Sequence, residues 1–201
     1  MNLGENFIQE GLVNRITPFH TNESNNFDTE KVYNNLMTRF KYGGLEQKGL
    51  YLDETVTRMC YTHRRLFGTL LTHLMKEGKK DKAKKAIEYA EKVLPTYYLP
   101  MNYLNGGMEF AMTYYELGMR QKGEQVINSM WKTCTQYLRW YLSLNQSKFI
   151  SSQRNCMFNL YAMQQMTDIV ARFDKSKANK MSAELNQLIS LYQSRGGSLG
   201  E

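Results

Sequence analysis

Proline and cysteine are both scarce, with three of each in 201 residues. Few prolines leave long helices uninterrupted, and the abundance of Ala, Leu, Met, Lys, Glu and Gln favours helix over sheet. The cysteines Cys60, Cys134 and Cys156 are odd in number and far apart, which excludes a disulfide framework and indicates small core residues. No run of about 18 apolar residues occurs, so the chain as given is not expected to span a membrane, and no signal peptide is visible.

The formal net charge of +7 bears on the kind of partner that the protein could bind. Clustered lysine and arginine would suggest a nucleic-acid partner. The densest basic run, Lys76 to Lys85, also carries Glu77 and Asp81 and coincides with an expected turn between helices. We therefore interpret it as a solvated turn and predict no nucleic-acid binding.

The first 52 residues form the least regular part of the sequence. Pro18, the polar tract from His20 to Asn26 and the Gly43-Gly44 pair interrupt any long periodicity. Asn6 to Phe19 is interpreted as a short helix followed by an extended strand. Asp28 has the character of a cap for a helix that ends near Lys41. We expect an irregular segment, 1–52, containing one clear helix.

A helix pair is predicted from Asp53 to Pro95. Asp53 caps the first helix, Gly78 ends it, Asp81 caps the second and Pro95 closes it. The apolar positions recur at spacings of 3 and 4, as on one helical face. They are Cys60, His63, Phe67, Leu70 and Leu74 in the first helix and Ala83, Ile87, Ala90 and Leu94 in the second.

Two further pairs follow with the same organisation. The second consists of a helix from Met101 to Leu117 that ends at Gly118, a turn from Arg120 to Gly123, and a helix with Val126, Ile127, Met130, Trp131, Cys134, Tyr137 and Leu138 inward. After a polar loop, Asn145 to Ser152, the third pair has Phe158, Ala162, Met166, Ile169 and Phe173 on one helix and Met181, Leu185, Leu188 and Tyr192 on the other. We therefore predict a helical domain over 53–195 and a disordered tail, 196–201.

The helix pairs resemble the tetratricopeptide repeat (TPR). A 34-residue frame from Arg64 places Phe67, Leu70, Leu71, Leu74, Gly78, Ala83, Ile87, Ala90 and Pro95 at marker positions. A second, degenerate unit has Ala111, Tyr114, Gly118 and Ile127 in place, but Gly123 replaces the expected alanine. The resemblance implies an all-α fold in which antiparallel helix hairpins stack as a TPR-like α-α superhelix, with the third pair as a capping unit.

A narrower resemblance covers nearly the whole chain. Four segments carry it: Phe7-Ile8-Gln9-Glu10-Gly11-Leu12-Val13-Asn14-Arg15-Ile16-Thr17-Pro18, Tyr42-Gly43-Gly44-Leu45, Gly49-Leu50-Tyr51-Leu52-Asp53-Glu54 and Tyr141-Leu142-Ser143-Leu144. In this order they resemble the soluble C-terminal region of bacterial multi-spanning membrane proteins of unknown function, which are similar to protein O-mannosyltransferases. The resemblance implies a domain at the periplasmic face of the inner membrane, attached to the membrane only through a preceding glycosyltransferase-like part. Without it, a soluble cytoplasmic protein is expected.

Several residue pairs could carry chemistry, but each has a simpler structural interpretation. Cys60 and His63 are spaced like a metal pair, yet zinc needs three or four ligands, so core packing is favoured. Gly43-Gly44 and Gly106-Gly107 lack the context of a phosphate loop, and Gly106-Gly107 is expected to permit close helix approach. Asp53-Glu54 suits helix capping better than acid-base catalysis. We predict no catalytic residue, metal or cofactor.

Aromatic side chains make up 12% of the sequence, and some do not fall on a single apolar face. Together with two arginines on the first repeat helix, they are the candidates for a partner surface. These residues are Arg64, Arg65, Tyr97, Tyr98, Trp140 and Tyr141, although inter-repeat packing and exposed charge remain the alternative interpretations.

Two functions remain open. The first is a non-catalytic interaction and scaffold domain that binds a protein or peptide partner, or its own membrane-embedded domain. The alternative is a domain that recognises a glycan or an acceptor on behalf of a protein O-mannosyltransferase-like enzyme. In both, any glycosyltransferase activity of a full-length protein would lie outside these 201 residues.

Overall fold

The computed structural model describes residues 6–22 and 26–198, and most of them are helical. These residues contain seven α-helices, a five-residue π-helix and a two-stranded sheet, which confirms the all-α class. The chain divides into two compact units, with unit 1 ending at Arg120 and unit 2 beginning at Gln121. The boundary predicted after residue 52 is a different division, which separates the irregular segment from the helix pairs.

Unit 1 opens with an antiparallel hairpin of β1 (Phe7–Gln9) and β2 (Asn14–Ile16). The short helix predicted within Asn6 to Phe19 is therefore wrong. Gly11, at φ 155°, lies in the turn, and the Asn6 side chain donates to the carbonyls of Thr17 and Phe19 across the open end. The main chain of Gln9 also bonds to the segment 26–28, a contact that local periodicity does not reveal.

The helix predicted after Asp28 is present. Asp28 accepts a hydrogen bond from the backbone N–H of Lys31 and caps α1 (Thr29–Asn34), which continues as the π-helix η1 (Asn35–Arg39). The turns end at Arg39, close to the expected Lys41. Val32 and Leu36 are fully buried, so this helix packs its apolar side against α2.

The first helix pair is α2 (Glu54–Lys76) and α3 (Lys80–Val93). Asp53 caps α2 as predicted, accepting from the N–H of Val56 at 2.8 Å, and Gly78 follows the helix with a left-handed φ of 72°. The predicted cap at Asp81 is wrong. Lys79 occupies the cap position of α3 but makes no side-chain hydrogen bond there. Asp81 lies in the first turn, where its negative charge interacts favourably with the positive end of the helix dipole.

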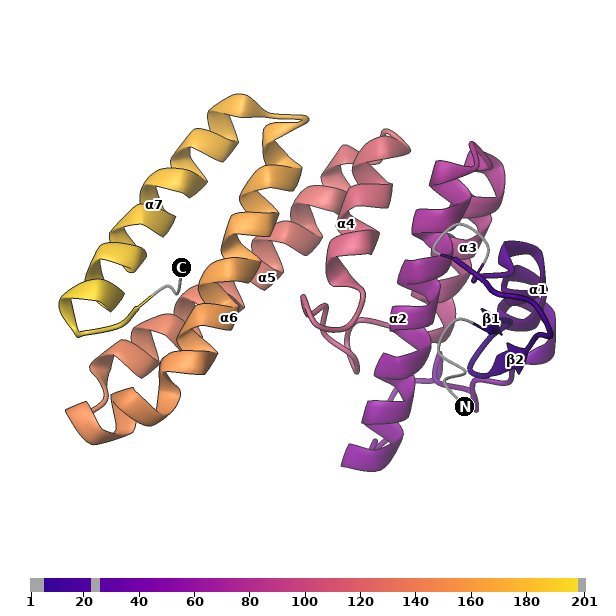
Figure 1. Cartoon of the computed structure of the whole chain (residues 1–201), viewed down its shortest axis with the longest axis horizontal. Helices are drawn as coiled ribbons and strands as arrows, with labels where there is room; N and C mark the ends of the chain where they lie inside the picture. Colours follow the sequence, from indigo (N-terminus) through magenta and orange to yellow (C-terminus); the bar gives the residue numbers. More distant parts are fainter. Residues whose placement is uncertain (1–5, 23–25, 199–201) are drawn as a thin grey trace. The chain divides into compact units, whose positions relative to one another are not determined.

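The predicted apolar faces of this pair are buried, apart from the half-buried His63. In Figure 1, α4 (Gly107–Glu116) and α1 lie on opposite sides of α2. A Cβ at Gly106 would lie 2.9 Å from the Arg64 carbonyl oxygen, and one at Gly68 would lie 3.2 Å from the Cβ of Glu109. The predicted close approach at Gly106 is therefore confirmed, between α4 and α2.

The helix expected from Met101 begins only at Gly107. Gly106 has a φ of 86°, and the Asn102 side chain bonds to the N–H of Leu104, so residues 101–106 form turns. The carbonyl of the preceding Pro100 is held by Arg64, outside any helix. Tertiary contacts thus shorten this helix although its sequence is compatible with a longer one.

Helix α5 (Arg120–Ser143) begins at the boundary between the units, and the rest of it forms unit 2 with α6 (Gln146–Ala171) and α7 (Lys175–Ser194). The turn predicted from Arg120 to Gly123 is wrong, because these residues form the first turn of α5. The polar loop predicted from Asn145 to Ser152 is wrong, because Asn145 caps α6 and these residues form its first turns around the buried Phe149. The apolar face of α6 also differs from the prediction. Phe158 is 46% exposed, whereas Cys156, Met163 and Val170 are buried.

The positions of α7 predicted to be inward, Met181, Leu185, Leu188 and Tyr192, are all buried, and Ala178 is buried as well. The Trp131 indole donates to Glu184 at 2.8 Å and connects α5 to α7. Gly197, in the predicted tail, donates its N–H to the carbonyl of Tyr192 at 3.0 Å, whereas residues 199–201 lie outside the described part of the chain.

Candidate functional site

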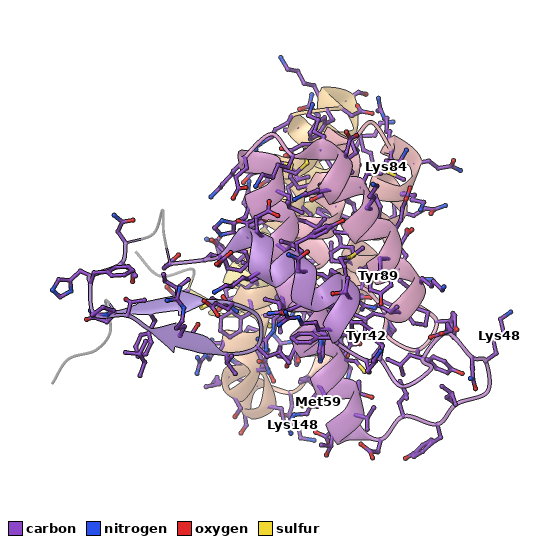
Figure 2. All side chains as sticks on the ribbon, turned by 90° about the vertical axis from the view of Figure 1, so that its right-hand side faces the viewer. Tyr42, Lys48, Met59, Lys84, Tyr89 and Lys148 are labelled. Carbon is purple, nitrogen blue, oxygen red and sulfur yellow. The ribbon has the colours of Figure 1, made fainter. Side chains whose placement is uncertain are left out.

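A long connection, residues 40–53, leads from η1 to α2 in unit 1 and forms one wall of the candidate site. Gly43 and Gly44 have φ values of 64° and 74°, and their flexibility permits the tight turn that follows Tyr42. The turn is closed by hydrogen bonds from Leu45 N–H to the Tyr42 carbonyl and from Gln47 N–H to the Gly44 carbonyl. Figure 2 shows Lys48 on this loop, carried out to the side of the helices.

Two tyrosines from the α3–α4 connection hold this loop. The Tyr97 hydroxyl donates to the Glu46 carbonyl and the Tyr98 hydroxyl to the Gln47 carbonyl, both at 3.0 Å. Tyr98 also accepts a 2.6 Å hydrogen bond from the N–H of Leu50. Both were predicted as partner-binding residues. Their hydroxyls instead bind the chain's own backbone, although the Tyr97 ring remains exposed.

Arg64 holds the connection that carries these tyrosines. Its guanidinium donates to the carbonyls of Leu94, Leu99 and Pro100 at 2.7, 2.6 and 3.2 Å. The residue is only 1% exposed, so its side chain lies inside unit 1 and not on the partner surface that the sequence predicted. The reason is that α3 ends beside α2, where its terminal carbonyl needs a donor.

The loop, the first turns of α2 and the end of α3 line a cavity of about 440 Å³ that is open to solvent on one side. This volume lies in the range typical of small-ligand and side-chain pockets. We call it the loop–α2 cavity. Its apolar lining comes from Leu45, Leu50, Leu52, Val56, Met59 and Leu94.

The polar groups that line the cavity are Lys41, Tyr42, Cys60 and His63, with the Thr55 hydroxyl near the helix start. Burial raises the pKa values of the Tyr42 hydroxyl and the Cys60 thiol, and it lowers the pKa of His63. All three are therefore neutral at pH 7. Lys41 is the single charged residue of the lining, which contains no carboxylate.

His63 illustrates how these groups are held. Its ring meets the rings of Phe40 and Tyr42 edge-on, with centroids 5.5 and 5.4 Å away, and its Nδ1 atom is buried without a hydrogen-bond partner among the described residues. In Figure 2, Tyr89, Tyr42 and Met59 follow one another down the face of unit 1. The Tyr42 and Tyr89 rings meet at 6.0 Å, so Tyr42 is a packed wall of the cavity.

The other candidate residues of unit 1 make contacts on the surface of α2. Glu54 faces the exposed Arg58 at 3.7 Å. Arg65 is exposed, as predicted, with one long hydrogen bond to Thr62. Across residues 6–22 and 26–198, no group of three or more potential metal ligands is present.

Trp140 and Tyr141 belong to unit 2 and lie together near the end of α5. Their ring centroids are 4.9 Å apart, and the Tyr137 ring stacks on Tyr141 at 6.2 Å. Trp140 is 55% exposed and Tyr137 is 51% exposed, so the inward position predicted for Tyr137 is wrong. The two predicted residues thus lie in a small aromatic cluster with Tyr137, and none of the three belongs to the lining of the loop–α2 cavity.

Comparisons with known proteins identify no relative of this chain. No protein-family model, no curated protein and no solved structure matches the chain. Among the helices that the structure describes, none is long and apolar enough to cross a membrane.

The sequence reasoning missed the loop residues of the cavity. Leu45, Leu50 and Leu52 lie outside any helical stripe, which is the pattern that identified the core. The sequence does contain an indication of this site, because three leucines occur within eight residues of a glycine-containing segment that has neither helical nor strand periodicity. Such residues need cover from elsewhere in the chain, and the tyrosines of the α3–α4 connection help to position them.

Proposed function

We propose that the protein is a non-catalytic interaction module and that the loop–α2 cavity binds an apolar side chain of a protein or peptide partner. One observation carries the proposal: the cavity is preformed and apolar, and its loop wall is fixed by hydrogen bonds from Tyr97 and Tyr98. A wall already held in place loses little conformational entropy when it binds a partner, which favours affinity.

The electrostatics favour binding over catalysis. A thiol nucleophile needs a lowered pKa, but burial raises that of Cys60. His63 faces aromatic rings, and the lining provides no carboxylate to orient it as a general base. The positive charge of Lys41 in the lining would favour a partner segment that is neutral or acidic next to its apolar side chain.

The helix pairs support assignment to the TPR class of interaction modules. Within α2 and α3, the positions corresponding to the repeat markers are buried, and Gly78 makes the turn. In the second helix pair, Ala111 and Tyr114 are buried and Gly118 has a left-handed φ of 75°. We propose that the three pairs form a TPR-like superhelix, with the first helices of successive pairs contributing to partner binding.

The cavity can be tested with small mimics of partner side chains. We expect N-acetyl-leucine amide and N-acetyl-phenylalanine amide to shift the methyl NMR resonances of Met59 and Leu50. The Met59→Trp variant places an indole in the cavity and is expected to abolish these shifts. Arg58→Trp is the matched control, because Arg58 is an exposed neighbour on α2 outside the lining.

Both mimics leaving the spectrum unchanged would contradict the proposal. Equal binding by Met59→Trp and by the wild-type chain would contradict it as well, since the indole should occupy the space that the mimics need.

The resemblance to membrane proteins similar to protein O-mannosyltransferases leads to a wider proposal. We infer that the chain is the periplasmic C-terminal part of such a protein and that its partner is the membrane-embedded domain or a protein bound to it. The test is deletion of the region corresponding to these 201 residues from the full-length protein. We expect loss of partner association with the catalytic part still folded, and unchanged association would refute the proposal.

A second candidate function, recognition of a glycan, is favoured by the aromatic cluster of Tyr137, Trp140 and Tyr141. Exposed aromatic rings can pack against the apolar face of a sugar, and here the exposed rings of Tyr137 and Trp140 both contact the half-buried ring of Tyr141. Titration with mannose oligosaccharides in a Trp131→Phe background isolates the fluorescence of Trp140. A saturable change that Tyr137→Ala removes would support this function, and a flat response would oppose it.

A further inference from the structure

The N-terminal hairpin has an open edge, which follows from the alternation of its hydrogen bonds. The N–H of Thr17 donates to the Asn6 carbonyl, and that of Glu10 donates to the Val13 carbonyl. In an antiparallel pair, inward and outward main-chain groups alternate along the strand. Arg15 pairs with Ile8 and therefore faces inward, so Asn14 and Ile16 direct their N–H and C=O groups outward.

The other edge of the hairpin is already occupied. Gln9 of β1 accepts from the N–H of Asp28 and donates to the carbonyl of Asn26, forming a bridge to the segment that leads into α1. In the described part of the chain, no such segment pairs with the outward groups of Asn14 and Ile16. We call these four groups, two N–H and two C=O, the outer edge of β2.

Apolar side chains surround the outer edge. Val13 is 72% exposed and Ile16 is 61% exposed, and Leu12 and Phe19 nearby are exposed too. All three residues of β2 are exposed, so no helix of unit 1 covers this strand. Figure 2 shows the two strands projecting to the left of α2. An edge strand that combines free main-chain groups with exposed apolar side chains is a template for strand pairing.

We propose that the outer edge of β2 is a strand-addition site, at which a partner polypeptide docks as a third strand of this sheet. The partner is an extended segment with apolar residues at alternating positions, because such a segment provides both main-chain hydrogen bonds and side-chain contacts to Ile16. A lipid surface would cover the side chains but leave the four main-chain groups without partners. The site is independent of the loop–α2 cavity.

The length of the hairpin supports the same conclusion. Each strand has three residues, and the bridge to segment 26–28 supports only the β1 side, so a third strand on β2 would stabilise the hairpin further. Asn14 and Ile16 lie on the same face of β2, so an added strand would place one apolar side chain of the partner opposite Ile16.

The test uses a neutral alternating heptapeptide of threonine and valine as the probe. We expect it to bind the whole chain and to slow amide exchange at Asn14 and Ile16. Ile16→Pro removes the outward N–H while keeping a φ suited to an edge strand, and Ile16→Ala removes the side chain but keeps the N–H. Affinity should fall about tenfold more in the proline variant, as expected for one lost main-chain hydrogen bond in a strand ladder.

Slow exchange at the inward amides of Arg15 and Thr17 checks that the proline variant keeps its hairpin. A second probe, the same peptide with every backbone nitrogen methylated, has no N–H donor on either edge, so it applies the same test to the unaltered chain and should not bind. Equal affinity of both probes, or equal affinity of the proline and alanine variants, would overturn the proposal. A dimer seen by sedimentation and lost in Ile16→Pro would also overturn it, in favour of a second copy as occupant. Binding to phospholipid vesicles without protection of the Asn14 and Ile16 amides would do the same in favour of a membrane.

Discussion

Replacing Arg64 by methionine tests whether a buried cation that donates its hydrogen bonds to backbone carbonyls organises the site. Methionine has a comparable length and no donors, so the substitution leaves the carbonyls of Leu94, Leu99 and Pro100 without Arg64. Two of these bonds are 2.6–2.7 Å long, in the range of charge-assisted hydrogen bonds.

The size of the expected loss of stability follows from two opposing effects. Each hydrogen bond to a charged group contributes about 1.5–3 kcal/mol, and a buried unsatisfied carbonyl costs about 1–3 kcal/mol. Burial of the guanidinium lowers the pKa of Arg64 to about 10, and relief from this desolvation offsets part of the loss. The acceptors are backbone groups that the mutation cannot remove, so the loss dominates. We expect Arg64→Met to destabilise unit 1 by about 3 kcal/mol.

The adjacent Arg65 provides the matched control, because it is exposed and makes one 3.5 Å hydrogen bond to Thr62. We expect Arg65→Met to change stability by less than about 0.5 kcal/mol. The assay is hydrogen exchange of α2 and α3 in urea, monitored by mass spectrometry. Both tryptophans, Trp131 and Trp140, lie in unit 2, so their fluorescence reports separately on the unit that the mutation should leave intact.

A similar stability of Arg64→Met and Arg65→Met would refute the reasoning. Loss of the Arg64 hydrogen bonds should also loosen the connection that carries Tyr97 and Tyr98. Weaker binding of N-acetyl-leucine amide at a urea concentration where the variant remains folded is therefore a second expected result.

Three further predictions follow from other contacts. Hydrogen bonds from Lys79 and Lys82 lower the pKa of Glu30 from 4.5 to about 2, so its contribution is present above pH 4.5 and lost as the pH falls through about 2. Because Glu30 is half exposed, we expect Glu30→Gln to cost only ~1 kcal/mol in urea unfolding at pH 7 and nothing near pH 2. A Cβ at Gly68 would lie 3.3 Å from the Cα of Gly106, so Gly68→Val should destabilise unit 1 by ~2 kcal/mol in thermal unfolding, whereas Val at the exposed Thr69 should be nearly neutral. Burial raises the pKa of Cys134 to about 12, so mass spectrometry should detect its alkylation by iodoacetamide at pH 8 only when urea unfolds unit 2, and modification in the native state would contradict this.

The sequence predicted helix ends correctly where the interactions that determine them lie within a few residues. Asp28, Asp53 and the glycines at positions 78 and 118 start or end helices through contacts within a few residues. Where apolar residues occupy more than one side of a helix, periodicity alone was insufficient. In α6 it selected Phe158, which is exposed, because polar residues such as Asn159 lie on the face that packs inward.

Two local patterns were misleading. The polar run from Asn145 to Ser152 has the composition of a loop, yet it forms two helical turns because Asn145 supplies the cap and Phe149 the buried anchor. The hairpin near the N-terminus depends on pairing with the segment 26–28, which a short sequence window does not include.

By itself, the sequence determined that this protein is helical, that Asp28 and Asp53 begin helices, that Gly78 ends α2, and that the apolar stripes of α2, α3 and α7 are buried, apart from the half-buried His63. The tertiary structure alone decided that Arg64 is an internal cation and that Tyr98 anchors a loop. The reason is distance along the chain. The Arg64 hydrogen bonds join residues 30 to 36 positions apart, and the bond from Leu50 to Tyr98 spans 48. Periodicity and capping extend over a few residues, so contacts of this separation, which build the loop–α2 cavity, appear only when the chain is folded.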